Sequence, residues 1–215
     1  MAIAMDKQQQ VEAVMAAAPV IPVVIVDEPA KAVALARALV AGGIPAIEVT
    51  LRTPRALECL AAIAAEVEGA IPGAGTVLTS AQVAAVETAG AKFMVSPGAA
   101  PKLLEAAAAS PLPLLPGAAT ATEMMALMER GYRHLKFFPA SVAGGAAYLK
   151  ALASPLPQVK FCPTGGISAE NAGDYLALPN VACVGGSWLA AEAAVAAGDW
   201  DAITKLAQEA AALRR

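Results

Sequence analysis

The sequence predicts an α/β fold, a (β/α)8 TIM barrel formed by a single domain over residues 1–215, with one helix before the first strand. Eight short runs rich in β-branched residues alternate with longer, alanine-rich helical stretches from about residue 20 to the end. The runs are apolar throughout, as expected for parallel strands buried on both faces. Eight such βα units in one chain of 215 residues favour a closed barrel.

The chain begins with a predicted amphipathic helix, in which Asp6, Lys7 and three glutamines precede the run VEAV at 11–14. This segment lacks the basic start and apolar centre of a signal peptide. The predicted strands follow at 20–26, 46–51, 70–76, 92–96, 112–116, 134–138, 159–163 and 181–185.

Local signals mark the ends of the helices between these strands. Thr53-Pro54 places a capping residue before a proline at the first helical position. Two segments have the form of a capping box, Thr79-x-x-Gln82 and Thr120-x-x-Glu123. A glycine turn between helix and strand is expected at Gly43, Gly90 and Gly131.

An open, doubly wound sheet is the alternative fold. Its dinucleotide-binding fingerprint has three glycines, and GAGTVL at 73–78 has leucine in the third position. No linker or change of composition divides the chain into two domains.

Composition argues against several classes of function. The formal net charge is −3 and no basic run occurs, which disfavours nucleic-acid binding as the main task. No uninterrupted apolar stretch of about 18 residues predicts a membrane span. Cys59, Cys162 and Cys183 lack metal-ligand spacing, and the chain has one histidine. We therefore expect a reduced, cytoplasmic protein without a metal site.

Polar residues and glycines gather at the predicted carboxyl ends of the strands, where barrels of this kind carry their active sites. These ends contain EVTLR (48–52), GAGT (73–76), SPG (96–98), PG (116–117), KFFP (136–139), PTGG (163–166) and GGSW (185–188).

Lys136 interrupts the apolar run RHLKFFPA. One interpretation is a lysine that extends its amine to the barrel mouth. The other is a Schiff-base amine: free lysine has a pKa of about 10.4, and an apolar site or a nearby cation lowers that pKa and frees the lone pair. Lys160 also lies in a predicted strand, but near its start, so its amine belongs at the opposite end.

Glu48 interrupts another strand, and residues 46, 48 and 50 share one face by strand alternation. A buried carboxylate needs a partner, so Glu48 is interpreted as a structural ion pair, a general acid/base beside Lys136, or both. Arg52 follows at the end of the same strand and could clamp a substrate carboxylate, or lie on the surface as predicted for Arg55.

Two glycine pairs end the predicted seventh and eighth strands, where this fold commonly binds phosphate through backbone N–H groups. They are Gly165-Gly166 and Gly185-Gly186, the second followed by Ser187. His134 is expected to have a structural role, and Cys162 and Cys183 to fill the core.

With these motifs the chain resembles the 2-keto-3-deoxy-6-phosphogluconate (KDPG) aldolase and 4-hydroxy-2-oxoglutarate aldolase family from about residue 21 to residue 206. The matching segments are LVAGGIPAIEVTLRT, GAGTVL, VSPG, PGAAT, KFFPA, FCPTGGIS and GGSWL. The resemblance implies a (β/α)8 class I aldolase of the Entner–Doudoroff pathway, typically a homotrimer. Such an enzyme needs no cofactor and cleaves the phosphorylated keto-deoxy sugar acid to pyruvate and glyceraldehyde 3-phosphate. Some members cleave 4-hydroxy-2-oxoglutarate.

The resemblance also implies roles for individual residues. Lys136 matches the Schiff-base lysine and Glu48 the acid/base. The positions that match substrate-binding groups are Arg52 and Thr76 for the pyruvate carboxylate, Phe138 beside the pyruvyl unit, and Thr164. The positions that match the phosphate cradle are Gly165, Gly166, Gly185, Gly186 and Ser187.

The chain departs from some relatives at two places. Val26 or Asp27 stands where those relatives have an arginine, which leaves phosphate binding to backbone amides. The segment SVAGG after KFFPA lies where relatives vary. PTGGI favours the gluconate-type enzyme over the galactonate type, which looks more like PVGGI. A galactonate-type or 4-hydroxy-2-oxoglutarate aldolase, another phosphate-binding barrel enzyme and a non-catalytic phosphosugar-binding protein are the alternatives.

Overall fold

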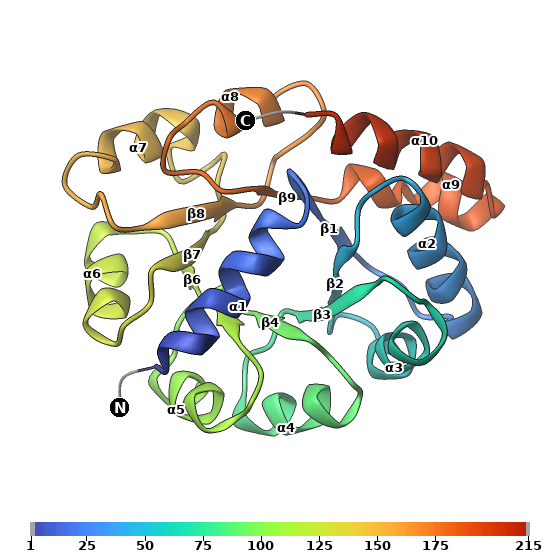
Figure 1. The fold of residues 1–215 in the computed structure, drawn as a ribbon, viewed down its shortest axis with the longest axis horizontal. Helices are drawn as coiled ribbons and strands as arrows, with labels where there is room; N and C mark the ends of the chain where they lie inside the picture. Colours follow the sequence, from blue (N-terminus) through green and yellow to red (C-terminus); the bar gives the residue numbers. More distant parts are fainter. Residues whose placement is uncertain (1–2, 214–215) are drawn as a thin grey trace.

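The computed structural model describes residues 3–213, so residues 1, 2, 214 and 215 of the predicted domain lie outside the described part. The fold is α/β, with parallel strands surrounded by helices (Figure 1). The strands are β1 Val20–Val24, β2 Ala46–Thr50, β3 Ile71–Gly75, β4 Phe93–Val95, β5 Leu114–Leu115, β6 Gly117–Ala118, β7 His134–Phe137, β8 Lys160–Pro163 and β9 Val184–Gly186. The helices are α1 Met5–Ala16, α2 Pro29–Ala41, α3 Ala56–Glu66, α4 Ser80–Thr88, α5 Pro101–Ala109, α6 Ala121–Glu129, α7 Gly145–Leu152, α8 Ala172–Leu176, the 3₁₀-helix η1 Trp188–Ala190, α9 Glu192–Ala197 and α10 Trp200–Ala211.

The strands pair in two groups, in the orders β5-β4-β3-β2-β1-β9 and β6-β7-β8. Pro116 alone separates β5 from β6. At the other side, isolated parallel bridges join Phe161 to Val181 and Thr164 to Gly185. Neighbouring strands therefore follow one another in sequence, as the alternating pattern of strands and helices predicts.

Every predicted strand is shortened or shifted by at least one residue, as three of them illustrate. The predicted fifth strand is interrupted at Pro116, because proline has no N–H to donate, and pairing resumes over Gly117–Ala118. The first strand ends at Val24, two residues early. The last begins at Val184, with only an isolated bridge at Val181.

The two predicted capping boxes are confirmed, at the N-termini of α4 and α6. The glycine turns are also confirmed, with φ values of 87° at Gly43, 83° at Gly90 and 90° at Gly131. The helix start predicted at Thr53-Pro54 is wrong, because α3 begins at Ala56. The Thr53 hydroxyl instead donates to the Val26 carbonyl at 2.6 Å, joining the loops that follow β2 and β1.

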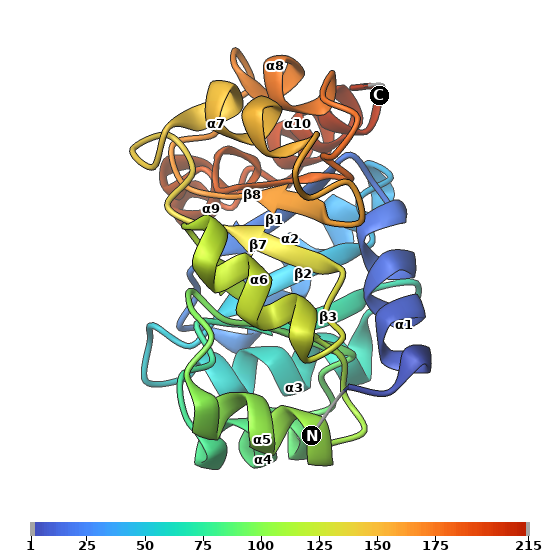
Figure 2. The same cartoon turned by 90° about the vertical axis from the view of Figure 1, so that its left-hand side faces the viewer.

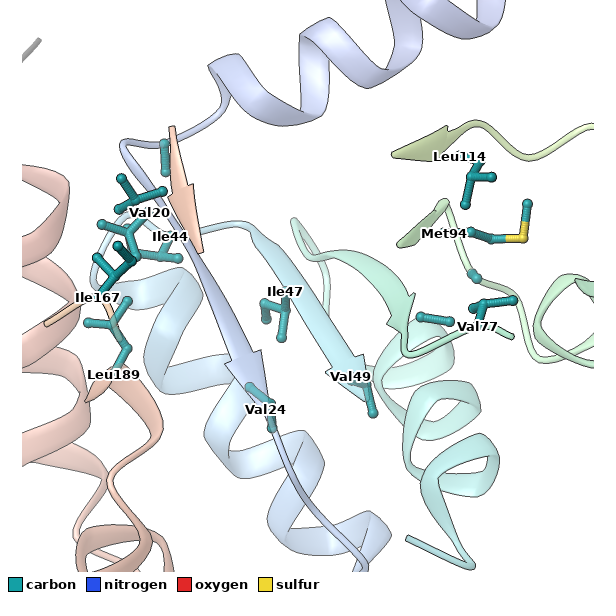
Figure 3. Close-up of a cluster of buried hydrophobic side chains, with 14 of the residues drawn as sticks. Val20, Val24, Ile44, Ile47, Val49, Val77, Met94, Leu114, Ile167 and Leu189 are labelled. Atoms are coloured by element: carbon teal, nitrogen blue, oxygen red, sulfur yellow. The ribbon is translucent and has the colours of Figure 1, made fainter. Parts of the chain in front are cut away.

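Apolar side chains form two layers. The outer layer fills the space between strands and helices and includes Val24, Ile47 and Val49 (Figure 3). The inner layer faces the interior that the strands enclose, and contains Ile21, Ala46, Phe93, Val95, Leu115, Cys162 and Cys183, with Val11, Val14 and Met15 from α1. Accordingly, α1 lies across one end of the strands (Figures 1 and 2). Among the described residues, no helix has the length and apolar character of a membrane span.

Candidate active site

Two charged side chains meet in the interior between the two groups of strands. Lys136 lies on β7 and Glu48 on β2, and the lysine Nζ is 3.2 Å from the glutamate Oε1. Each side chain is only 4% exposed. Desolvating two charges offsets most or all of the attraction between them, so a buried ion pair contributes little to stability by itself. Chemistry is the better explanation for keeping this pair.

The surroundings of the Lys136 amine are largely apolar. The Phe138 ring centroid is 5.4 Å from Nζ. In the strand register, the neighbours of Lys136 are Gly117 on β6 and Cys162 on β8, a residue without a side chain and a small buried one. Neither neighbour supplies a competing charge.

Arg52 and Thr76 lie together just after the ends of β2 and β3. The Arg52 Nε donates to the Thr76 hydroxyl at 3.3 Å. Thr76 has a φ of 59°, in the left-handed region that residues other than glycine rarely adopt, and such strain is concentrated at functional sites. Arg55, by contrast, is an exposed arginine whose guanidinium pairs with Glu58 at 2.9 Å. The pair Arg52–Thr76 thus offers donors just beyond the carboxyl end of the strand that carries Glu48.

Thr164 and the two glycine pairs lie at the carboxyl ends of β8 and β9. Thr164 is buried, and its backbone bridges to Gly185 across the β8–β9 edge. A Cβ atom at Gly185 would stand 2.2 Å from the Thr164 hydroxyl, so glycine is required for this close approach. Gly165 and Gly166 have φ values of 99° and 73°, which turn the chain away from β8.

Ser187 follows β9 directly and lines a cavity of about 590 Å³ at the end of β1. Val26 and Asp27 also line this cavity, and neither carries a positive charge. The Asp27 carboxylate accepts a hydrogen bond from the backbone N–H of Arg55 at 2.8 Å. Lys31 reaches the same cavity, but its ammonium pairs with Glu28 at 2.8 Å.

Lys160 and His134 lie away from this site, at the start of their strands. The exposed Lys160 amine donates to the Pro179 carbonyl at 2.7 Å, so Lys160 does not compete with Lys136 for the site. His134 is buried and, with Glu12 and Lys160, lines a separate cavity of about 350 Å³. Burial lowers the pKa of its imidazole, Glu12 opposes that shift and Lys160 adds to it.

Sequence patterns did not single out Ser141, and they placed Thr50 on the inward face with Glu48 without assigning it a role. The Ser141 hydroxyl lies so close to Gly166 that a Cβ there would be 2.1 Å from its Oγ. The sequence signal that could have pointed to Ser141 is its position directly after KFFPA. Thr50 is fully buried, and its hydroxyl donates to the Val24 carbonyl at 2.9 Å, which ties β2 to β1 beside Glu48. Within residues 3–213, no three His, Cys, Asp or Glu side chains are grouped to hold a metal ion.

Comparison with known proteins identifies the family. A family model described as "KDPG and KHG aldolase" matches residues 11–206. A 2-dehydro-3-deoxy-phosphogluconate aldolase of Pseudoalteromonas atlantica is 53% identical over 194 residues, which cover 90% of each chain.

Solved structures agree with this match. The KDPG aldolase of Legionella pneumophila, crystallised with pyruvate captured at low pH as a covalent carbinolamine intermediate, has a TM-score of 0.91 and 49% identity over 94% of this chain and 98% of its own. The aldolase of Zymomonas mobilis with 3-phosphoglycerate has a TM-score of 0.90 and 45% identity over 97% and 98%. The chain belongs to the KDPG and KHG aldolase family.

Proposed function

We propose that the chain is a class I aldolase that cleaves KDPG to pyruvate and glyceraldehyde 3-phosphate through a Schiff base on Lys136. The observation that carries the proposal is the buried Lys136–Glu48 contact of 3.2 Å. A distance of this size lets one group pass a proton to the other. The covalent pyruvate adduct captured in the Legionella relative supports the same chemistry for this chain.

The reaction begins with attack of the neutral Lys136 amine on the C2 carbonyl carbon of the substrate. A bond forms between Nζ and C2, and proton transfers through Glu48 turn the carbonyl oxygen into a hydroxyl. That hydroxyl leaves as water, and the product is a protonated imine.

Carbon–carbon cleavage follows. The Glu48 carboxylate removes the proton of the C4 hydroxyl, the C3–C4 bond breaks, and its electron pair moves into the imine to form an enamine. The aldehyde departs, the enamine is protonated at C3, and water hydrolyses the imine to release pyruvate. The protonated imine is the electron sink, so we propose an enzyme that needs no metal or other cofactor.

The remaining residues hold the substrate. We assign the pyruvate carboxylate to Arg52 and Thr76, and the contacts along the pyruvyl unit to Phe138 and Thr164. The phosphate lies against the backbone N–H groups of the cradle, which is formed by Gly165, Gly166, Gly185, Gly186 and Ser187. Lys31, the cation among the described residues that lines the cavity at the end of β1, is paired with Glu28, so we assign phosphate binding to these amides. The family model also favours 4-hydroxy-2-oxoglutarate as a second substrate, and comparing kcat/KM for the two acids ranks them.

Borohydride trapping tests the mechanism. Reduction in the presence of pyruvate should attach a pyruvyl adduct to Lys136, located by peptide mass mapping. The Lys136→Met variant should lose both the adduct and aldol cleavage. Lys160→Met is the matched control, since Lys160 is the other lysine in a strand, and it should retain both. Active protein with an unmodified Lys136 would refute the Schiff-base mechanism.

The strand pairings also support a complete (β/α)8 barrel, in which the bridges from Phe161 to Val181 and from Thr164 to Gly185 close the ring. The homotrimer and the cytoplasmic location stay predictions. Light scattering coupled to size-exclusion chromatography tests the first.

A further inference from the structure

Strand β3 presents no side chains to the interior beside the proposed acid/base. In the register with β2, Gly73 pairs with Glu48 and Gly75 with Thr50, so both glycines lie on the inward face that Glu48 occupies. Neither glycine has a positive φ, so the backbone does not require glycine at either position. The reason for the two glycines must therefore be space.

Two neighbouring side chains fill that space. A Cβ atom at Gly73 would stand 2.3 Å from the Phe93 ring, which reaches over from β4. A Cβ atom at Gly75 would stand 2.2 Å from the Glu48 Oε1 and 2.5 Å from its Cγ. The three atoms nearest to that position all belong to Glu48.

This arrangement fixes the direction of the Glu48 side chain. The position over Gly73, directly opposite the Glu48 backbone, is occupied by Phe93. The carboxylate instead leans over Gly75, one inward position nearer the carboxyl ends of the strands, where its Oε1 meets the Lys136 amine at 3.2 Å. With any side chain at position 75, the carboxylate would have room over neither residue.

We infer that Gly75 is a positioning residue for the reaction, because its missing side chain leaves the space from which the Glu48 carboxylate reaches Lys136. The inference rests on the proposed function, since it assigns no chemistry to Gly75 and acts through Glu48. It also explains the GAG segment at 73–75, which resembles the start of a dinucleotide-binding loop but lies under a carboxylate.

A double-mutant cycle with Glu48 tests the inference. Gly75→Ala should lower kcat for aldol cleavage about 10²-fold with little change in KM, because a displacement of about 1 Å has effects of that size. Glu48→Gln should lower kcat by about 10²–10⁴-fold. If Gly75 acts through the carboxylate, adding Gly75→Ala to Glu48→Gln should lower kcat by a further factor of less than about three. The effects of coupled residues are not additive.

Gly173→Ala is the matched control, because a Cβ atom there meets nothing within 4 Å, and it should keep the parent kcat. A Gly75→Ala enzyme with the parent kcat would overturn the inference, as would an equal loss in both Glu48 backgrounds. Full activity of Glu48→Gln would instead overturn the acid/base role of Glu48 in the proposed function, and with it this inference.

A second comparison applies if Gly75→Ala does not fold. Truncating Glu48 should remove the overlap between its side chain and the methyl group added at position 75. The double variant Gly75→Ala/Glu48→Ala should therefore unfold at the same temperature as Glu48→Ala alone. A double variant that is unstable where Glu48→Ala folds would show that position 75 is crowded by something other than Glu48, and would overturn the inference.

Discussion

At the scale of single residues, His134 is a titratable group that the proposed mechanism does not use. Its side chain is buried, and among the described residues its Nδ1 has no hydrogen-bond partner. Burial lowers the pKa of the imidazole, the carboxylate of Glu12 on α1 raises it, and the ammonium of Lys160 on β8 lowers it. The folded chain thus favours neutral His134.

This preference predicts a pH dependence of stability. An unfolded histidine titrates near pH 6.5, above the lowered pKa in the folded chain, so on acidification the unfolded chain binds the proton first. The stabilisation is complete above about pH 6.5 and is lost as the pH falls through the folded pKa. Urea unfolding at several pH values should show a steeper acid loss for the parent than for His134→Asn. Parallel curves would contradict the prediction.

Residue types and their positions in the strands were sufficient to predict that the side chains of Lys136 and Glu48 lie near each other. Lys136 and Glu48 interrupt apolar strands near their carboxyl ends, and the structure brings their side chains within 3.2 Å. Lys160 could be set apart because it stands at the start of its strand. The space over Gly75 could not be predicted in this way, because it depends on the direction in which side chains from two other strands lean.

At the scale of elements, α1 is attached to the C-terminal end of α5 through Lys7. Lys7 is 7% exposed, and its Nζ donates to the carbonyls of Ala107 and Ala108 at 2.9 Å each, and to that of Ser110. These carbonyls lie at the C-terminal end of α5, where the last turn of a helix lacks intrahelical donors and favours a cation. One ammonium group thus satisfies carbonyls that the helix leaves free.

Replacing this lysine should weaken the whole fold. Lys7→Met keeps much of the apolar stem but leaves the α5 carbonyls without their donor, and hydrogen bonds to charged groups contribute about 1.5–3 kcal/mol. The free energy of unfolding should fall by about that amount in urea titrations. Lys102→Met, at an exposed lysine of α5, is the control and should change the free energy of unfolding by less than about 0.5 kcal/mol. Equal effects of the two substitutions would refute the anchoring role of Lys7.

Element boundaries could be predicted where the signal is local. Both capping boxes form within one turn of the chain, and both are present. Thr53 failed as a cap because its hydroxyl bonds to Val26, which is 27 positions away in the sequence. Such a partner comes near only when the strands β1 and β2 are already side by side, so no local pattern contains it.

At the scale of the whole molecule, the two ends of the parallel strands have different surroundings. The carboxyl ends hold the Lys136–Glu48 pair, whereas α1 covers the opposite end (Figure 2). The side chain of Gln8 accepts from the backbone N–H of Arg133 at 2.6 Å, just before β7. The alternation of strands and helices predicted the parallel α/β arrangement, but it contained no information on where a helix outside that repeat would pack.

Met15 tests this division between the two ends. Its side chain is 1% exposed and belongs to the inner apolar layer with Phe93 and Cys162. Met15→Ala should lower the free energy of unfolding by about 2–5 kcal/mol, because it removes buried methylene groups and leaves a cavity. Met125→Ala, at a methionine that is 56% exposed, is the control and should cost less than about 0.5 kcal/mol.

The same variant should retain catalysis under conditions where it is folded. Met15 lies on the helix that covers the end opposite to Lys136, so kcat/KM for KDPG cleavage below the unfolding transition should match the parent value. A large loss of kcat/KM in folded Met15→Ala would mean that the packing of α1 reaches the Lys136–Glu48 pair through the inner layer. Unchanged stability would mean that α1 is not part of the cooperative core.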